Sequence, residues 1–304
     1  MNRRRALTTG AALLLLQLAL LPVAPAAARF WPLKRESVPA APAPLPAHAA
    51  AGLAPAPPAA SVRLQVHDRG SHYDVEVSNP LPGPVQVRLA LTGGEGLRPA
   101  PRLPAEAVLP AHAARILARL YRDGAQAVDG FTLDLVQVPG DPRARALDAP
   151  YRLPFEGAPV RLDQGFGGHY SHADPANYYA VDFALPEGTP VLAARDGVVL
   201  EIVAGDPRTG HAVRILHDDG SMAVYAHLQA GSAAVRIGER ARQGQRIARS
   251  GNTGFSTAPH LHFAVQANAG MQLRSIPFRM FADAGELKFA RDETTAQGAS
   301  VPSR

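Results

Sequence analysis

Residues 211–228 have the sequence HAVRILHDDGSMAVYAHL, in which two runs of alternating apolar residues flank Asp218-Asp219-Gly220. Alternation on both sides of an Asp-Gly step is typical of a β-hairpin, because glycine tolerates the backbone that a tight turn requires. Upstream, residues 188–203 (GTPVLAARDGVVLEIV) predict two further strands with a turn at Arg195-Asp196-Gly197. Helical periodicity is almost absent after residue 150, so we expect residues 151–284 to form an antiparallel β domain.

A second β region precedes this domain, over residues 61–150. Turns rich in proline and glycine separate four alternating stretches, which are VRLQV (62–66), YDVEV (73–77), VQVRLAL (85–91) and FTLDLVQV (131–138). Strands at this regular spacing favour an immunoglobulin-like β-sandwich. Residues 111–121 (AHAARILARLY) fit a helix or a strand, and we favour a strand. We therefore predict an all-β chain, and nothing in the sandwich sequence indicates its partner.

The N-terminus has the features of a secretory signal peptide over residues 1–28. Arg3, Arg4 and Arg5 precede an apolar stretch (6–21), and the small residues around Ala26 fit a cleavage site. A membrane anchor is the alternative, but the stretch is shorter than the roughly 20 residues of a spanning helix. We expect export to the periplasm or cell envelope, by the general secretory or the twin-arginine route.

Two other segments lack the patterning of a folded core. Residues 29–60 are dominated by alanine and proline, a composition typical of a semi-rigid linker. Residues 285–304 form a small, polar tail in this interpretation. No stretch after the signal peptide is apolar for long enough to span a bilayer, so we expect no membrane span in the mature chain.

The composition excludes several classes of function. The chain has no cysteine, which excludes disulfides, thiol catalysis and cysteine-bound zinc, so a metal would be held by His, Asp or Glu. The three arginines at 3–5 supply three of the five net positive charges, which leaves the remainder at +2. Without a basic stripe we expect no nucleic-acid partner. The chain also lacks the Gly-Lys-Ser/Thr step of a P-loop.

Residues 259–263 (PHLHF) and 179–185 (YAVDFAL) carry side chains suited to metal chemistry. In a strand, His260 and His262 share one face at a spacing of about 6.6 Å, although His-x-His pairs also occur by chance. Asp182 faces away from Val181 and Phe183. A carboxylate within an apolar strand is costly unless it is paired or binds a cation, and a solvent-facing position is the alternative.

Two further stretches add ionisable side chains. Alternation in residues 223–228 (AVYAHL) places His227 on the same face as Ala223 and Tyr225. Residues 170–174 (YSHAD) follow a glycine-rich turn, and either His172 or Asp174 can turn inward there.

Taken together, five motifs in this order resemble the LytM/lysostaphin-type zinc metallopeptidases, which are cell-wall endopeptidases with a small, nearly all-β catalytic domain. The resemblance covers roughly residues 160–270. The motifs are SH (171–172), YAVDFALPEGTPVLAARDGVV (179–199), VYAHL (224–228), IGERARQGQ (237–245) and SGNTGFSTAPHLHFAV (250–265). The sandwich and the linker lie outside it.

The resemblance implies one zinc ion per chain, held by His172, Asp182 and His262. In the family's commonest pattern the first histidine lies four residues before the aspartate, where this chain has Tyr178. His172 is our choice because a Ser-His pair followed by an insertion resembles a variant of the family, and His169 is the second choice. The family's non-ligand histidines correspond to His227 and His260.

The implied chemistry is hydrolysis of an amide by a zinc-bound water. Three protein ligands leave the fourth position of zinc open, and zinc lowers the pKa of bound water to about 7. The chain has no His-Glu-x-x-His motif, so a histidine is left as general base. We assign His260 as the base and His227 as the stabiliser of the oxyanion, with exchanged or shared roles as the alternative.

We therefore expect an exported zinc endopeptidase that cuts the peptide cross-links of bacterial peptidoglycan, so that peptide stems are its binding partner. The alternative is a non-catalytic LytM-like regulator that activates another cell-wall hydrolase. Regulators of this kind have lost metal ligands, whereas all five site residues are available here.

Overall fold

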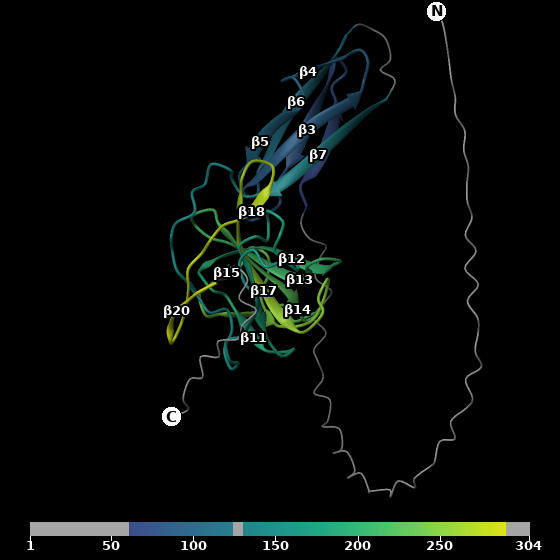
Figure 1. Ribbon diagram of the computed structural model, residues 1–304. Helices are drawn as coiled ribbons and strands as arrows, with labels where there is room; N and C mark the ends of the chain where they lie inside the picture. Colours follow the sequence, from purple (N-terminus) through teal and green to yellow (C-terminus); the bar gives the residue numbers. More distant parts are fainter. Residues whose placement is uncertain (1–60, 124–129, 290–304) are drawn as a thin grey trace, which may run out of the picture. The chain divides into compact units, whose positions relative to one another are not determined.

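The computed structural model describes residues 61–123 and 130–289, and every regular element in these two ranges is a β-strand (Figure 1). This confirms the all-β fold class. The predicted signal peptide (1–28) and linker (29–60) lie outside the described residues, as does the tail from residue 290 onward. Within the described ranges, no helix is long and apolar enough to cross a membrane.

Residues 63–139 form two antiparallel sheets, which we call the two-sheet region. One sheet has the strand order β1-β2-β6-β4 and the other β5-β3-β7. The strands are β1 (Arg63–Asp68), β2 (His72–Ser78), β3 (Val85–Gly93), β4 (Leu97–Ala100), β5 (Ala105–Leu109), β6 (Ala114–Arg122) and β7 (Phe131–Pro139). The segment 111–121, which fitted a helix or a strand, thus forms most of β6.

The two sheets pack face to face, because their inward side chains share common cores. Val75 of β2 and Leu120 of β6 pack with Leu89 of β3 from the opposite sheet, and all three are fully buried. Val77 of β2 likewise packs with Val87 of β3. Two sheets around one core match the predicted sandwich, while its immunoglobulin-like character stays a prediction.

Residues 151–289, the site region, contain a larger antiparallel sheet with the order β15-β12-β13-β14-β17-β10-β9, and β18 pairs with β17 (Figure 1). Its strands are β9 (Leu162–Gln164), β10 (Ala180–Ala184), β12 (Gly197–Asp206), β13 (Gly210–Leu216), β14 (Met222–Leu228), β15 (Arg240–Ala241), β17 (His260–Asn268) and β18 (Leu273–Ser275). Two small sheets accompany it, made of β8 (Tyr151–Arg152), β11 (Pro190–Leu192), β16 (Arg246–Arg249), β19 (Met280–Ala282) and β20 (Gly285–Leu287).

The predicted hairpin is present as β13 and β14, with Asp218-Asp219-Gly220 in the turn between them. One face of the large sheet carries the main core, which includes Phe183 of β10, Tyr225 of β14 and Phe263 of β17. All three are fully buried, and burial of a large side chain of this kind stabilises the fold by about 1.5–3 kcal/mol. The core thereby fixes which side chains of these strands point to the opposite face.

The end of the site region extends into the segment predicted as a polar tail. Strand β20 pairs with β19, and Phe289 is buried against Phe166 and Phe278. Within the described residues this concerns positions 285–289, and an aromatic side chain explains why this short piece joins the core. The described fold therefore ends five residues later than the boundary of 284.

Candidate metal centre and active site

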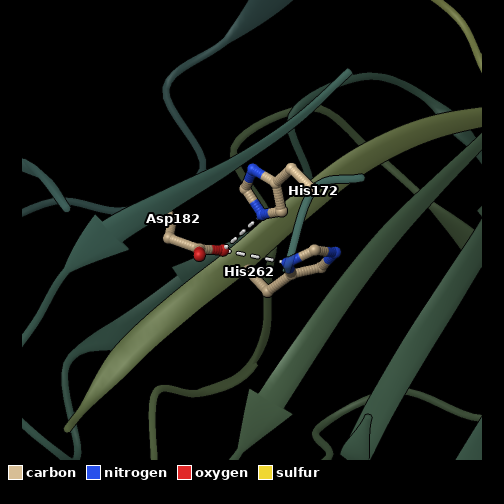
Figure 2. A group of neighbouring side chains, drawn as sticks. All are labelled: His172, Asp182 and His262. Carbon is tan, nitrogen blue, oxygen red and sulfur yellow. Dashed lines mark hydrogen bonds and ion pairs between the residues drawn. The ribbon is translucent and has the colours of Figure 1, made fainter. Parts of the chain in front are cut away.

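Asp182 and His262 lie opposite each other on neighbouring strands. In the antiparallel pairing of β10 with β17, Asp182 is the register partner of His262, and Phe183 is the partner of Leu261. Since the apolar neighbours point into the core, the carboxylate and the imidazole share the other face. His262 Nδ1 lies 2.9 Å from Asp182 Oδ1 (Figure 2).

His172 reaches the same carboxylate from the loop between β9 and β10. Its Nε2 lies 3.3 Å from Asp182 Oδ1, and its Nδ1 lies 2.8 Å from the carbonyl oxygen of Gly165. Because a carbonyl only accepts hydrogen bonds, Nδ1 carries the proton and Nε2 presents a lone pair toward Asp182. The side chain of His172 is fully buried, and in Figure 2 dashed lines join one carboxylate oxygen of Asp182 to both histidines.

The alternatives left open by the sequence lie elsewhere. Asp174 does not turn toward Asp182 but accepts hydrogen bonds within its own loop, from Asn177 and from the backbone of Ala176. His169 is exposed and is not a member of the metal-type group. That group consists of His172, Asp182 and His262, whose ligand atoms all lie within 4.8 Å of one another.

The donor set fits a divalent metal ion such as zinc. Two imidazole nitrogens and one carboxylate oxygen are ordinary zinc ligands, and three protein ligands leave a position open for water or substrate. All three side chains are buried, so unpaired they would be costly to keep there. A cation between them would satisfy all three at once.

Charge within the group is strongly coupled. Burial by itself would raise the pKa of Asp182, but the two imidazoles, when protonated on the nitrogens that face it, donate hydrogen bonds that hold that pKa well below its usual range. Burial would lower the pKa of His172, but the carboxylate of Asp182 stabilises its protonated form and raises that pKa. Asp182 is therefore an anion at every physiological pH, which is the state that binds a cation.

The other two predicted histidines flank the group. His260 Nε2 lies 3.9 Å from Asp182 Oδ1, and the ring of His227 lies 4.5 Å from that of His260 and 5.8 Å from that of His262. The Nδ1 atom of His227 lies 2.7 Å from the Thr253 carbonyl oxygen, and that of His260 lies 2.8 Å from the Ala258 carbonyl oxygen. Both rings therefore donate through Nδ1, which leaves Nε2 as a proton acceptor.

The alternation argument was wrong for His227. Tyr225 points into the core, whereas His227 lines the same groove as Ala226, the register partner of His262. His227 has a φ of 58°, a left-handed conformation that costs a non-glycine residue about 1–3 kcal/mol. This conformation, next to a bulge in the pairing of β13 with β14, turns the ring to the site face.

A close approach of two loops holds His227 in this conformation. Its backbone N–H donates to the carbonyl of Thr209 at 2.9 Å, and its ring donates to the carbonyl of Thr253. Gly254 has a φ of +77°, and a Cβ there would collide with the backbone of Gly210. Burial is the main reason that the pKa of His227 is lowered to about 4.

Two amide side chains near the group were not predicted from the sequence. Gln164 of β9 donates from Nε2 to Asp182 Oδ2 at 3.0 Å, and it accepts at Oε1 from the backbone N–H of Tyr170. Asn177 Oδ1 lies 3.2 Å from His262 Nε2. Each lies on the segment that leads to the aspartate, but a single amide in a loop or strand carries no recognisable spacing signal.

A groove runs past these residues. Loop residues 170–171 and 255–258 line it together with His227, His260, His262 and Arg208, and the exposed rings of Tyr170 and Phe255 stack at 5.8 Å with an interplanar angle of 12°. Asp182 also lines this groove, whereas the fully buried side chain of His172 does not.

The sequence model of Peptidase family M23 matches residues 176–273. This segment contains Asp182, His227, His260 and His262, and His172 lies just before its start. Residues 176–273 are thus similar to Peptidase family M23, which confirms the family resemblance seen in the motifs.

Curated relatives and solved structures are similar to parts of this chain. Glycyl-glycine endopeptidase ALE-1 of Staphylococcus capitis is 38% identical over 106 residues, which are 34% of this chain and 29% of that protein. Peptidoglycan DD-endopeptidase ShyA of Vibrio cholerae is 38% identical over 117 residues, or 38% of this chain and 25% of that protein. The structure of the lysostaphin catalytic domain from Staphylococcus simulans is 29% identical and covers 42% of this chain and 87% of that chain, with a TM-score of 0.32. The chain spans 18% to 29% of the length of these and similar curated relatives.

Proposed function

We propose that this protein is an exported, zinc-dependent endopeptidase that hydrolyses the peptide cross-links of bacterial peptidoglycan. The observation that carries the proposal is the buried group of His172, Asp182 and His262 beside two histidines in an open groove. These three residues would hold one zinc ion per chain. When bound, zinc lowers the pKa of water and polarises a carbonyl.

His260 and His227 would handle the protons of the reaction. Each ring gives its Nδ1–H to a backbone carbonyl, so Nε2 faces the groove as an acceptor. We assign His260 as general base because its Nε2 is 3.9 Å from Asp182 Oδ1, close to where the scissile amide must lie. After protonation, either ring can donate a hydrogen bond, and we assign His227 to the developing oxyanion.

The substrate proposal rests on the relatives. Two of them are named for peptidoglycan DD-endopeptidase activity and one for glycyl-glycine endopeptidase activity. The predicted signal peptide supports export, and the absence of cysteine excludes a lipid anchor on cysteine, so we propose a periplasmic enzyme. We propose that it cuts D-Ala to meso-diaminopimelate cross-links rather than glycine bridges. All five site residues are present, so a non-catalytic regulator is not favoured.

Digestion of purified sacculi by residues 29–304 tests this function, with the released muropeptides identified by mass spectrometry. We expect cross-linked dimers to disappear and monomers to accumulate, and His262→Ala to abolish both changes. An unchanged sacculus with zinc-loaded protein, and with a truncated chain starting near Pro150, would contradict the proposal.

A further inference from the structure

The four histidines of the site are held in two different ways. His172, His227 and His260 each donate from Nδ1 to a backbone carbonyl, and each therefore presents Nε2 to the site. His262 is reversed, because its Nδ1 faces Asp182 and its Nε2 faces a side chain, Asn177 Oδ1 at 3.2 Å. The orientation of this one ring thus depends on a residue that can be changed without altering the backbone.

The hydrogen-bond directions around Asn177 determine which of its two ends faces the ring. Its Nδ2 lies 2.9 Å from Asp174 Oδ2. A carboxylate only accepts hydrogen bonds, so the NH2 end of the amide must point to Asp174 and the oxygen must point to His262. An amide oxygen only accepts, so His262 Nε2 carries a proton and Nδ1 is the atom available as a metal ligand.

Asp174 is itself held firmly. Its Oδ1 accepts from the backbone N–H of Ala176 at 2.9 Å, and Arg208, an exposed residue, approaches Oδ2 at 3.4 Å. The loop is also anchored to the sheet, because Gln266 Nε2 donates to the Ala176 carbonyl at 2.9 Å and Ser275 donates to the Pro175 carbonyl. The chain of hydrogen bonds from Ala176 to His262 is therefore built on fixed backbone.

We propose that Asn177 is a positioning residue for the metal site, which fixes the tautomer and ring orientation of His262 so that Nδ1 points to the metal. The inference rests on the proposed zinc function. Partners of metal-binding histidines of this kind typically change metal affinity or activity by about 10–100-fold when they are removed. In this role Asn177 acts on the metal through His262.

The test measures zinc affinity by competition with a chromophoric chelator in residues 29–304. We expect Asn177→Ala to weaken zinc binding by about 10–100-fold while the melting temperature of the zinc-free protein stays unchanged. Gln272→Ala, which removes an exposed amide on the turn after β17, serves as the matched control and should bind zinc like the wild type.

A swap of the two side chains separates positioning from a general structural role. Asn177→Asp alone sets two carboxylates against each other and should weaken zinc binding. The double variant Asn177→Asp with Asp174→Asn reverses the hydrogen bond between the two positions but keeps it, and it keeps an acceptor oxygen facing His262 Nε2, so it should recover most of the affinity. If Asn177→Ala destabilises the zinc-free fold, the zinc affinities of Asn177→Asp and of the double variant are compared instead.

The outcomes distinguish this inference from the proposed function. Equal zinc affinity in wild type and Asn177→Ala, or no recovery in the double variant, would overturn the positioning role even if the wild type digests sacculi. A wild-type protein that binds no zinc would overturn the proposed function itself.

Discussion

Asp74 of the two-sheet region and Asp182 of the site region are both buried aspartates on strands, yet their surroundings differ. Each is 6% exposed, and each faces its register partner on an antiparallel neighbour, Arg119 for Asp74 and His262 for Asp182. Asp74 is neutralised by two guanidinium groups, with Arg69 Nε and Arg119 Nε both at 3.1 Å. Asp182 has two histidines and an amide instead.

This difference shows that the partners, rather than the buried carboxylate, indicate a metal site. A guanidinium keeps its charge at all relevant pH values, so Asp74 is already paired with two permanent cations, and His72 Nε2 lies 3.4 Å from its Oδ1 as well. Neutral imidazoles present lone pairs. A carboxylate beside two such lone pairs forms a set of three ligand atoms that can bind one metal ion.

The largest expected effect separates the two aspartates. Asp182→Asn removes the anion of the metal group, and we expect the protein to lose its bound zinc. Activity should fall by more than about 100-fold, which is the upper end of the effect of removing a hydrogen-bond partner of a metal ligand. Asp74→Asn should lower the melting temperature and leave zinc content and specific activity within about twofold. Zinc analysis and muropeptide release on both variants make the comparison, and a zinc-loaded, active Asp182→Asn protein would refute it.

Next in size is the loss of a histidine that is not a ligand. His260→Ala should lower kcat by about 10²–10⁴-fold, the usual contribution of a general base, with one zinc retained per chain. His67→Ala, in which the lost ring lies beside Glu76 in the two-sheet region, is the control and should keep full activity. Loss of zinc from His260→Ala would instead make this residue a ligand.

A smaller effect is expected from the amide that holds Asp182. Gln164→Ala removes the hydrogen bond to Oδ2, which should weaken zinc binding by about tenfold and leave the ligands in place. Gln164→Glu brings a second carboxylate to the same point and should lower activity as well. Chelator competition measures both, and wild-type affinity in Gln164→Ala would show that the strand pairing alone orients Asp182.

The smallest effect on zinc binding and activity concerns His217, a buried polar residue of the site region that lies outside the site and whose loss changes the pH dependence of stability. Burial lowers its pKa to about 4, and within the described residues its Nε2 has no hydrogen-bond partner. Below about pH 6.5 the unfolded chain protonates this histidine, whereas the folded chain does so only below about pH 4. The free energy of unfolding therefore decreases by up to about 3 kcal/mol as the pH is lowered across this range. His217→Leu should lack this loss.

Denaturant unfolding of both zinc-free proteins at pH 7 and pH 4.5 measures the difference. The wild type should lose about 2–3 kcal/mol more than the variant between the two pH values. Equal losses of unfolding free energy in the wild type and in His217→Leu would mean that His217 is protonated in the folded state.

The sequence predicted most of the strands, because alternation and turn residues are local signals. Asp182, His260 and His262 follow directly from strand periodicity once Val181 and Leu261 are assigned to the core. The orientation of His227 could not be predicted, because a left-handed residue is imposed by packing between loops. Gln164 and Asn177 were missed for a similar reason, since their roles depend on distances between segments.

The most direct test of the central assignment is the zinc content of three proteins after exhaustive dialysis: wild type, His172→Ala and His169→Ala. The account predicts one zinc per chain in the wild type and in His169→Ala, and none in His172→Ala, because His172, and not His169, belongs to the buried metal-type group with Asp182 and His262. One zinc retained by His172→Ala, with loss from His169→Ala, would contradict it.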